Sequence, residues 1–110
     1  RRIGPGRTRE LMLTNRRLSA AEALDWGLAN EVVAPADLTP RVTALAAQFA
    51  AGPTAAYGRV KELLAASATN NIETQMELEA RAIADSARTA DAREGIGAFL
   101  NKRKPVFRGQ

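Results

Sequence analysis

The stretch Asp91-Ala-Arg-Glu-Gly-Ile-Gly-Ala-Phe-Leu-Asn-Lys-Arg-Lys-Pro-Val-Phe107 is the strongest pointer to both architecture and function in this chain. Its pattern predicts a helix in which Asp91 accepts from the free amides of the first turn and Glu94 reaches back, as in a capping box. The apolar residues of this helix recur at the spacing of one helical face, at Ile96, Phe99 and Leu100. The three cations at 102–104 then either complement the helix dipole or bind an anion.

Capping and spacing arguments predict further helices on the N-terminal side of this stretch. They are a short helix over Arg7–Thr14 after a Gly4-Pro5-Gly6 turn, one from Ala20 to Trp26 capped by Ser19 with Glu22 and ended by Gly27, one from Thr39-Pro40 to Gly52-Pro53, one over Thr54–Ala68, and one capped by Asn70 with Glu73. Residues 31–34 are at most a short extended piece. We therefore expect an all-α fold, whose apolar faces must pack together or against another chain to offset conformational entropy.

The 110-residue chain contains no cysteine and no histidine. The lack of cysteine excludes disulfides and thiolate metal sites and fits a reducing cytoplasm, where we expect the protein to reside. The lack of histidine removes the commonest general base and the commonest zinc ligand, so no metal site is predicted. No apolar run approaches the roughly 18 residues that a bilayer span needs, and we expect no membrane association.

The net charge of +4 is unevenly distributed along the chain. Residues 1–18 carry six arginines against one glutamate, and residues 102–110 carry four basic residues and no acidic one, whereas the middle of the chain is acidic. A duplex-binding protein needs cations along one continuous surface, and a base-stacking platform needs more aromatic residues than the five present here. We expect no nucleic-acid partner.

The carboxylates are not arranged as general acids or bases. Glu73, Glu77, Glu79 and Asp85 fall on the outward side of one predicted helix, where nothing would raise their pKa values toward neutrality. The glycines do not form a phosphate-binding loop between a strand and a helix. Two of them, Gly95 and Gly97, lie inside the predicted last helix, which indicates a close helix crossing or a ligand near the backbone. The residues alone therefore indicate a helical module without catalytic apparatus.

Three blocks of sequence resemble the C-terminal part of the crotonase, or enoyl-CoA hydratase/isomerase, superfamily. The first runs from Ile3-Gly4 through Glu10-Leu-Met-Leu-Thr14 and Leu18-Ser-Ala-Ala-Glu-Ala23 to Gly27-Leu-Ala-Asn-Glu-Val-Val33. The second is the helix with Pro53 and Ala55 ahead of Lys61, and the third joins Glu79 to the stretch from Asp91 to Phe107. The blocks follow the family's order and spacing across nearly the whole chain.

The resemblance implies an architecture. Residues 1–34 would end the family's ββα-spiral core region and connect to it, and residues 35–110 would form the C-terminal helical domain that mediates trimerisation and completes the CoA pocket. The spiral core itself would precede this chain. The first residue, Arg1, is not a methionine, which fits either processing or a fragment of a longer protein. The expected assembly is a homotrimer or a dimer of trimers.

The resemblance also implies a function. The leading expectation is an enoyl-CoA hydratase of the fatty-acid-oxidation type, with an enoyl-CoA isomerase or another CoA-enolate enzyme, and a non-catalytic oligomerisation module, as alternatives. The family's catalytic residues would lie before this chain, so none is assigned within it, and acyl-CoA is a substrate that requires no further cofactor. Lys102 matches the family lysine that reaches the adenosine-phosphate end of CoA. Phe99 would pack either at the helical interface or near the same pocket. Ile83 stands where some family members place an aromatic residue against the adenine, and it would offer apolar contact without stacking.

Overall fold

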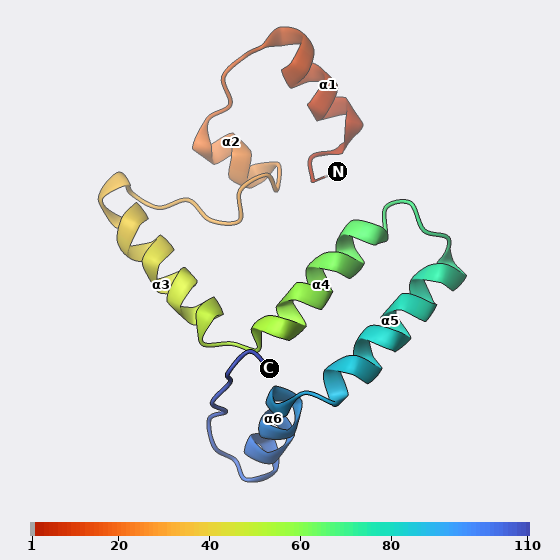
Figure 1. The fold of residues 1–110 in the computed structure, drawn as a ribbon. Coiled ribbons are helices and arrows are strands. Elements are labelled where there is room, and N and C mark those ends of the chain that lie inside the picture. Colours follow the sequence, from red (N-terminus) through yellow and green to blue (C-terminus); the bar gives the residue numbers. More distant parts are fainter. Residues whose placement is uncertain (1) are drawn as a thin grey trace. The chain divides into compact units, whose positions relative to one another are not determined.

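The computed structural model describes residues 2–110, and all the regular structure in that range is helical (Figure 1). The elements are α1 (Gly4–Thr14), α2 (Ala20–Asp25), the 3-10 turn η1 (Pro35–Asp37), α3 (Leu38–Ala50), α4 (Thr54–Ala66), α5 (Ile72–Ala87) and α6 (Ala90–Leu100). The expectation of an all-α fold is therefore confirmed over the described residues. No helix in that range is long and apolar enough to cross a bilayer.

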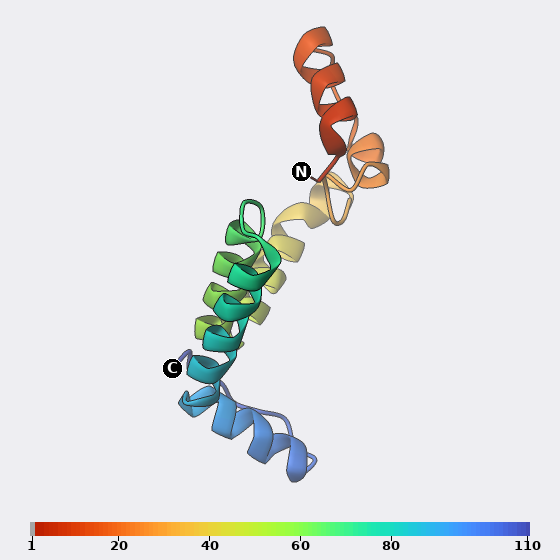
Figure 2. The same cartoon turned by 90° about the vertical axis from the view of Figure 1, so that its right-hand side faces the viewer.

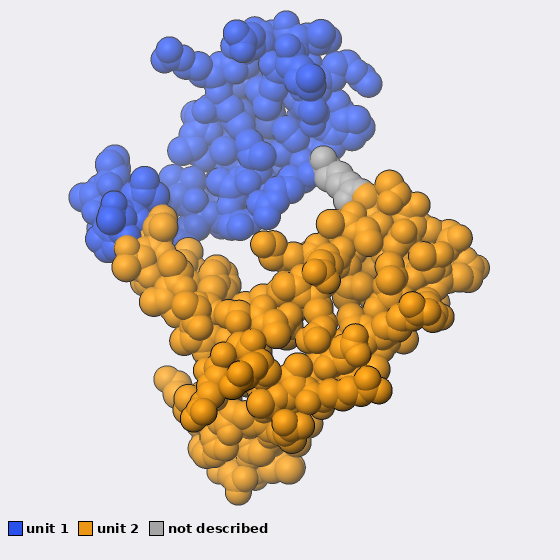
Figure 3. All heavy atoms as spheres, in the orientation of Figure 1, with its two compact units in different colours: residues 1–41 blue, residues 42–110 orange. Residues whose placement is uncertain are grey.

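The chain divides into two compact units, residues 1–41 and residues 42–110 (Figure 3). In the first unit, the capping box predicted for α2 is present. The Ser19 hydroxyl accepts from the Glu22 amide at 3.2 Å, and the Glu22 carboxylate accepts from the Ser19 amide at 3.0 Å. Gly27 lies just after the C-terminal cap of α2 and has a left-handed φ of 72°, as its position requires. The predicted turn at Gly4-Pro5-Gly6 is wrong, because these residues form the first turn of α1, where proline lacks only an amide that would go unused.

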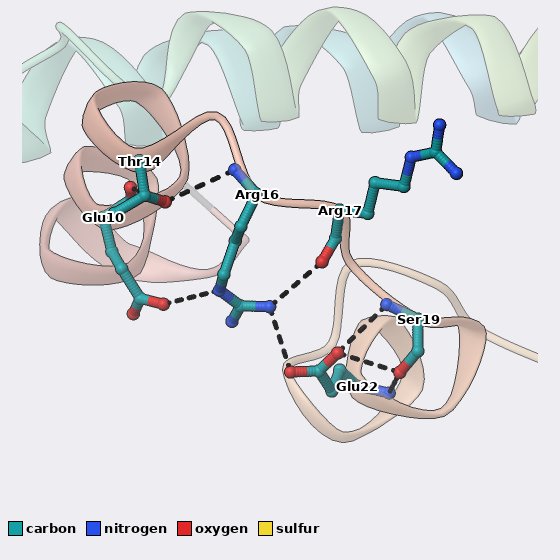
Figure 4. A network of polar contacts seen from close by, with 6 residues as sticks. All are labelled: Glu10, Thr14, Arg16, Arg17, Ser19 and Glu22. Atoms are coloured by element: carbon teal, nitrogen blue, oxygen red, sulfur yellow. Dashed lines mark hydrogen bonds and ion pairs between the residues drawn. The ribbon is translucent and has the colours of Figure 1, made fainter.

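Arg16, between α1 and α2, ties the first unit together (Figure 4). Its guanidinium donates to Glu10 on α1 at 2.8 Å and to Glu22 on α2 at 3.1 Å. The same guanidinium stacks on the Trp26 ring at 5.0 Å from the centroid, and Arg7 stacks on that ring at 4.7 Å. Trp26 is therefore a packing residue whose ring is held by two cations.

In the second unit, α4 and α5 form an antiparallel helical hairpin, and α6 follows α5 (Figures 1 and 2). Polar side chains join the hairpin: Gln75 donates to the Leu63 carbonyl at 3.4 Å, and Arg59 donates to the Ser86 hydroxyl at 3.3 Å. The cap of α5 is Asn71, whose side chain accepts from the Thr74 amide at 2.8 Å. The prediction of Asn70 was thus displaced by one residue.

Two further helix starts differ from the sequence predictions. Helix α3 begins at Leu38, directly after the 3-10 turn, so Thr39 and Pro40 lie inside it. Helix α6 is capped by Thr89, whose hydroxyl accepts from the Ala92 amide at 3.1 Å. The predicted capping box of Asp91 with Glu94 is therefore wrong. Thr89 reaches the free amides first and leaves both carboxylates available for other partners.

The second unit has a very small interior. Ala98 is the buried apolar residue, with 1% of its surface exposed, and Asp91 is the buried charged residue, with 5% exposed. Large apolar side chains on α3, α4, α5 and α6 remain half-exposed or more, among them Val42, Phe49, Val60, Leu64, Ile72, Met76, Ile83, Ile96, Phe99 and Leu100. Packing within the unit therefore leaves the predicted apolar faces largely uncovered.

Candidate functional site

Helix α6 ends in a left-handed turn centred on Lys102. The Lys102 amide donates to the Phe99 carbonyl at 3.1 Å, and the Arg103 amide donates to the Ala98 carbonyl at 3.0 Å. This is the Schellman pattern, in which glycine usually occupies the left-handed position. Lys102 adopts it with a φ of 52°, although a β-carbon there costs about 1–2 kcal/mol. Non-glycine residues in strained backbone conformations cluster at functional sites, so the Lys102 side chain is a candidate for a functional role.

The three cations of this turn have different surroundings. The Arg103 guanidinium makes a two-pronged ion pair with Glu94, with N–O distances of 2.5 and 2.7 Å. The ammonium groups of Lys102 and Lys104 have no hydrogen-bond or ion-pair partner among residues 2–110. Arg103 is thus occupied by a carboxylate instead of merely complementing the helix dipole, and the lysines stay available to an anion.

Asp91 and Glu94 hold the C-terminal strap, which we define as residues 104–110. The Asp91 carboxylate accepts from the Arg108 amide at 2.7 Å and from the Gly109 amide at 2.8 Å, and the Asp91 amide donates to the Gln110 carbonyl at 2.8 Å. Glu94 accepts from the Val106 amide at 2.8 Å in addition to pairing with Arg103. The two carboxylates therefore fold the strap back along α6.

These contacts fix the charge state of Glu94. Hydrogen bonds from Arg103 and from the Val106 amide lower its pKa from 4.5 to about 2. A general acid or base near neutral pH needs a pKa shifted upward, so Glu94 acts as an anchor and not as a proton carrier. Glu77 on α5 pairs with Arg81 of the same helix, and Asp85 pairs with Arg88 at the C-terminal cap of that helix. Residues 2–110 hold no group of three potential ligands that could bind a metal ion.

Phe107 closes the strap over the middle of α6. Its ring lies against Gly95, where an added β-carbon would stand 3.5 Å from the nearest ring atom. The close approach expected at Gly95 is thus made by the chain's own strap, whereas nothing lies within 4 Å of a β-carbon at Gly97. Beside Phe107 lies an apolar groove of about 350 Å³, lined among others by Ala56, Ser86, Ala92 and Ile96.

The three residues predicted to contact CoA do not share one cavity. Phe99 is 82% exposed near the end of α6, two residues before the turn that carries Lys102. Ile83 is 70% exposed on α5 and lines a shallow apolar groove of about 360 Å³ with Val60 and Leu63. That groove includes neither Phe99 nor Lys102.

The sequence contained a signal for the strap that the capping interpretation concealed. Thr89 stands two residues before Asp91 and is itself a strong N-cap residue. A helix capped by Thr89 leaves two acidic residues one turn apart without a capping role. Proline at 105, which stops the chain from continuing as a helix, favours a reversal toward them.

Comparison with known proteins places the whole chain in one family. The family model described as enoyl-CoA hydratase/isomerase matches residues 1–110. The chain belongs to the enoyl-CoA hydratase/isomerase family. It is 37% identical over 107 residues to the 1,2-epoxyphenylacetyl-CoA isomerase of Escherichia coli K12, covering 97% of this chain and 41% of that protein. It is 38% identical over 110 residues to the "Probable enoyl-CoA hydratase" of Rhodobacter capsulatus, covering 100% and 43%.

Solved structures of this family have the same fold. A crystal structure of enoyl-CoA hydratase subunit I from Geobacillus kaustophilus HTA426 superposes with a TM-score of 0.92 at 35% identity, covering 99% of this chain and 42% of that one. The chain thus spans about two fifths of the length of the family members it matches. The strap and the Lys102 turn belong to a segment that enoyl-CoA hydratase/isomerase family members share.

Proposed function

We propose that this chain is the C-terminal helical region of an enoyl-CoA hydratase, which adds water across the double bond of a trans-2-enoyl-CoA. Its own contribution is to bind the phosphate-bearing end of CoA, and the groups that move protons lie elsewhere in the longer protein. Two features support this division. The family members named above carry names that refer to different CoA thioesters. In addition, the carboxylate of this chain whose pKa is shifted most, Glu94, has its pKa lowered and not raised.

Lys102 carries the proposal. Its ammonium has no partner among residues 2–110, while the adjacent Arg103 is occupied by Glu94. A lysine ammonium is a compact point charge that suits phosphate, and its flexible stem allows it to reach a ligand. Lys102 occupies a left-handed backbone position that glycine would fit better, which supports a role for this side chain in binding.

Phe99 and Ile83 would supply apolar contact to the same substrate. Phe99 precedes the Lys102 turn and is almost fully exposed, so its ring is available to a ligand or a neighbouring chain. Ile83 offers an apolar surface without the flat face that stacks on an adenine. No cofactor is required in this scheme, because acyl-CoA is itself the substrate.

The exposed apolar faces support assembly as a homotrimer or a dimer of trimers, in a cytoplasmic enzyme. Side chains such as Leu64, Met76 and Leu100 are each more than half exposed, and faces of this kind mark interaction surfaces. An isomerase is the second candidate, because one relative is named as an isomerase at 37% identity. A purely structural helical module is the third candidate, favoured by the same uncovered faces.

The experiment is to replace Lys102 by methionine in the longer enzyme and to compare two substrates. One is a trans-2-enoyl-CoA, and the other is the corresponding enoyl-pantetheine, which lacks the nucleotide phosphates. Loss of a phosphate contact removes binding shared by ground state and transition state, so KM for enoyl-CoA should rise roughly tenfold with kcat unchanged. KM for enoyl-pantetheine should not change. Lys104→Met is the matched control, and equal effects of both variants on both substrates would refute the assignment.

A further inference from the structure

Glu94 contacts the chain on both sides of the Lys104–Pro105 pair. It pairs with the side chain of Arg103, directly before Lys104, and it accepts from the Val106 amide, directly after Pro105, at 2.8 Å. The segment between these contacts contains Lys104 and Pro105 and directly follows Lys102. Glu94 thus closes a loop whose entry is the left-handed turn.

Asp91 completes the closure one helical turn earlier. Each of its two carboxylate oxygens accepts a hydrogen bond from one backbone amide, that of Arg108 or that of Gly109. Replacing either oxygen by a hydrogen-bond donor would therefore remove one of these bonds. Asp91 is 5% exposed, and its own amide holds the Gln110 carbonyl at 2.8 Å. Phe107, between the two anchor points, packs on Gly95. Residues 103–110 are therefore fixed to α6 at several consecutive points.

This fixation bears on Lys102 because the lysine stands in a backbone conformation that its side chain disfavours. A lysine at the left-handed position would relax if the chain after it were free to move. Arg103 directly follows Lys102, and the hydrogen bond from its amide to the Ala98 carbonyl defines the turn. The side chain of the same residue pairs with Glu94. Stabilising Arg103 therefore stabilises the conformation of Lys102.

We propose that Glu94 and Asp91 are positioning residues that clamp the C-terminal strap to α6 and so hold Lys102 in the geometry that binds the phosphate end of a CoA thioester. The inference rests on the proposed function of Lys102 and goes beyond it, because neither carboxylate touches the substrate. Their negative charges alone would repel phosphate. Their removal should nevertheless weaken binding, because the clamp is lost.

The test is Glu94→Gln in the longer enzyme, compared with Glu77→Gln. The control removes a carboxylate that also pairs with an arginine, Arg81, on the exposed side of α5. Glu94→Gln should raise KM for enoyl-CoA about three- to tenfold, with kcat and the KM for enoyl-pantetheine unchanged. Glu77→Gln should change none of these values. Asp91→Asn should act in the same direction and more strongly, since an amide nitrogen would then face a strap amide.

A double variant distinguishes positioning from a separate effect on stability or charge. If Glu94 acts through Lys102, Glu94→Gln should cause no further rise in KM when Lys102 is already methionine. The inference would be overturned if the KM increases of the two single variants multiplied in the double variant. It would also be overturned if KM for enoyl-pantetheine rose as much as KM for enoyl-CoA. Failure of the proposed function is a different result, in which Lys102→Met itself leaves KM for enoyl-CoA unchanged. A Lys102→Met effect without any Glu94→Gln effect would refute the clamp alone.

Discussion

Lys102 and Gly27 occupy equivalent positions in two helix-ending turns of the same chain. After α2, the Gly27 amide donates to the Leu24 carbonyl and the Leu28 amide to the Ala23 carbonyl, at 3.0 and 2.8 Å. The turn after α6 repeats this pattern around Lys102, with φ values of 72° and 52° at the two central residues. The chain thus uses glycine where only the turn matters and lysine where, in our proposal, a cation is needed.

Lys102→Gly should separate the backbone role of this position from its side-chain role. Removing the β-carbon relieves the left-handed strain, so the turn should become more stable by about 1 kcal/mol. The Arg103 amide, whose bond closes the turn, should then exchange its hydrogen about fivefold more slowly. CoA affinity should fall at the same time. Lys102→Ala is the control, because it removes the charge and keeps the strain, and slower exchange in that variant would contradict the explanation.

Glu94 gives the strap a defined pH dependence. The Arg103 pairing and the Val106 amide lower its pKa from 4.5 in the unfolded chain to about 2, with a small further contribution from the charge of Arg108. A lowered folded-state pKa means that ionised Glu94 stabilises the strap above pH 4.5, and that this contribution disappears as the pH falls toward 2. The side-chain carboxyl carbon of Glu94 should titrate by NMR with a midpoint near 2.

The same linkage can be checked through stability. The melting temperature of the wild type should exceed that of Glu94→Gln at pH 6, and the difference should shrink steadily below pH 4.5. The comparison isolates Glu94 because all other carboxylates titrate in both proteins. A difference that stays constant down to pH 2 would show that the Gln substitution acts through something other than the lost charge.

At the scale of the helices, Thr89 sets the start of α6 and so determines what Asp91 does. Thr89→Ala removes the acceptor for the Ala92 amide and should destabilise the protein by about 1 kcal/mol. Thr89→Ser keeps the hydroxyl and should stay within a few tenths of a kcal/mol. Urea denaturation of the two variants provides the measurement. If Asp91 were the cap, Thr89→Ala would be nearly neutral.

The helices were predictable from local chemistry, and their ends were less so. Ser19 with Glu22 and the left-handed Gly27 were identified correctly, because both signals act over four residues or fewer. The starts of α5 and α6 were displaced because two capping residues compete within a few positions, Asn70 with Asn71 and Thr89 with Asp91. The strap was missed because its bonds join Asp91 to residues 17 and 18 positions later, and the capping pattern assigned to Asp91 concealed the freed carboxylates that the strap uses.

At the scale of the whole molecule, the apolar line of α5 shows how much surface remains uncovered. Ile72, Met76 and Ile83 recur at helical spacing and form an apolar line that has to pack on a neighbour, yet they are 70%, 64% and 70% exposed. The hydrogen bonds that join α5 to α4 instead use Gln75 and Ser86 of α5. Sequence periodicity thus identified an apolar face correctly without indicating what covers it.

Met76→Glu should therefore weaken assembly of the longer enzyme and leave the hairpin of α4 and α5 intact. An exposed side chain in the second unit makes little contribution to the unit's own packing, whereas burying a methionine in an interface contributes roughly 1.5–3 kcal/mol. Sedimentation velocity should show a shift from the proposed trimeric or hexameric species toward smaller ones, with unchanged helix content by circular dichroism. Thr74→Glu adds the same charge to the exposed surface of α5 on the other side of the helix, and it should leave assembly unchanged. A Met76→Glu protein that sediments like the wild type would show that this face is not an assembly interface, and the apolar line of α5 would then have to be covered by the rest of its own chain.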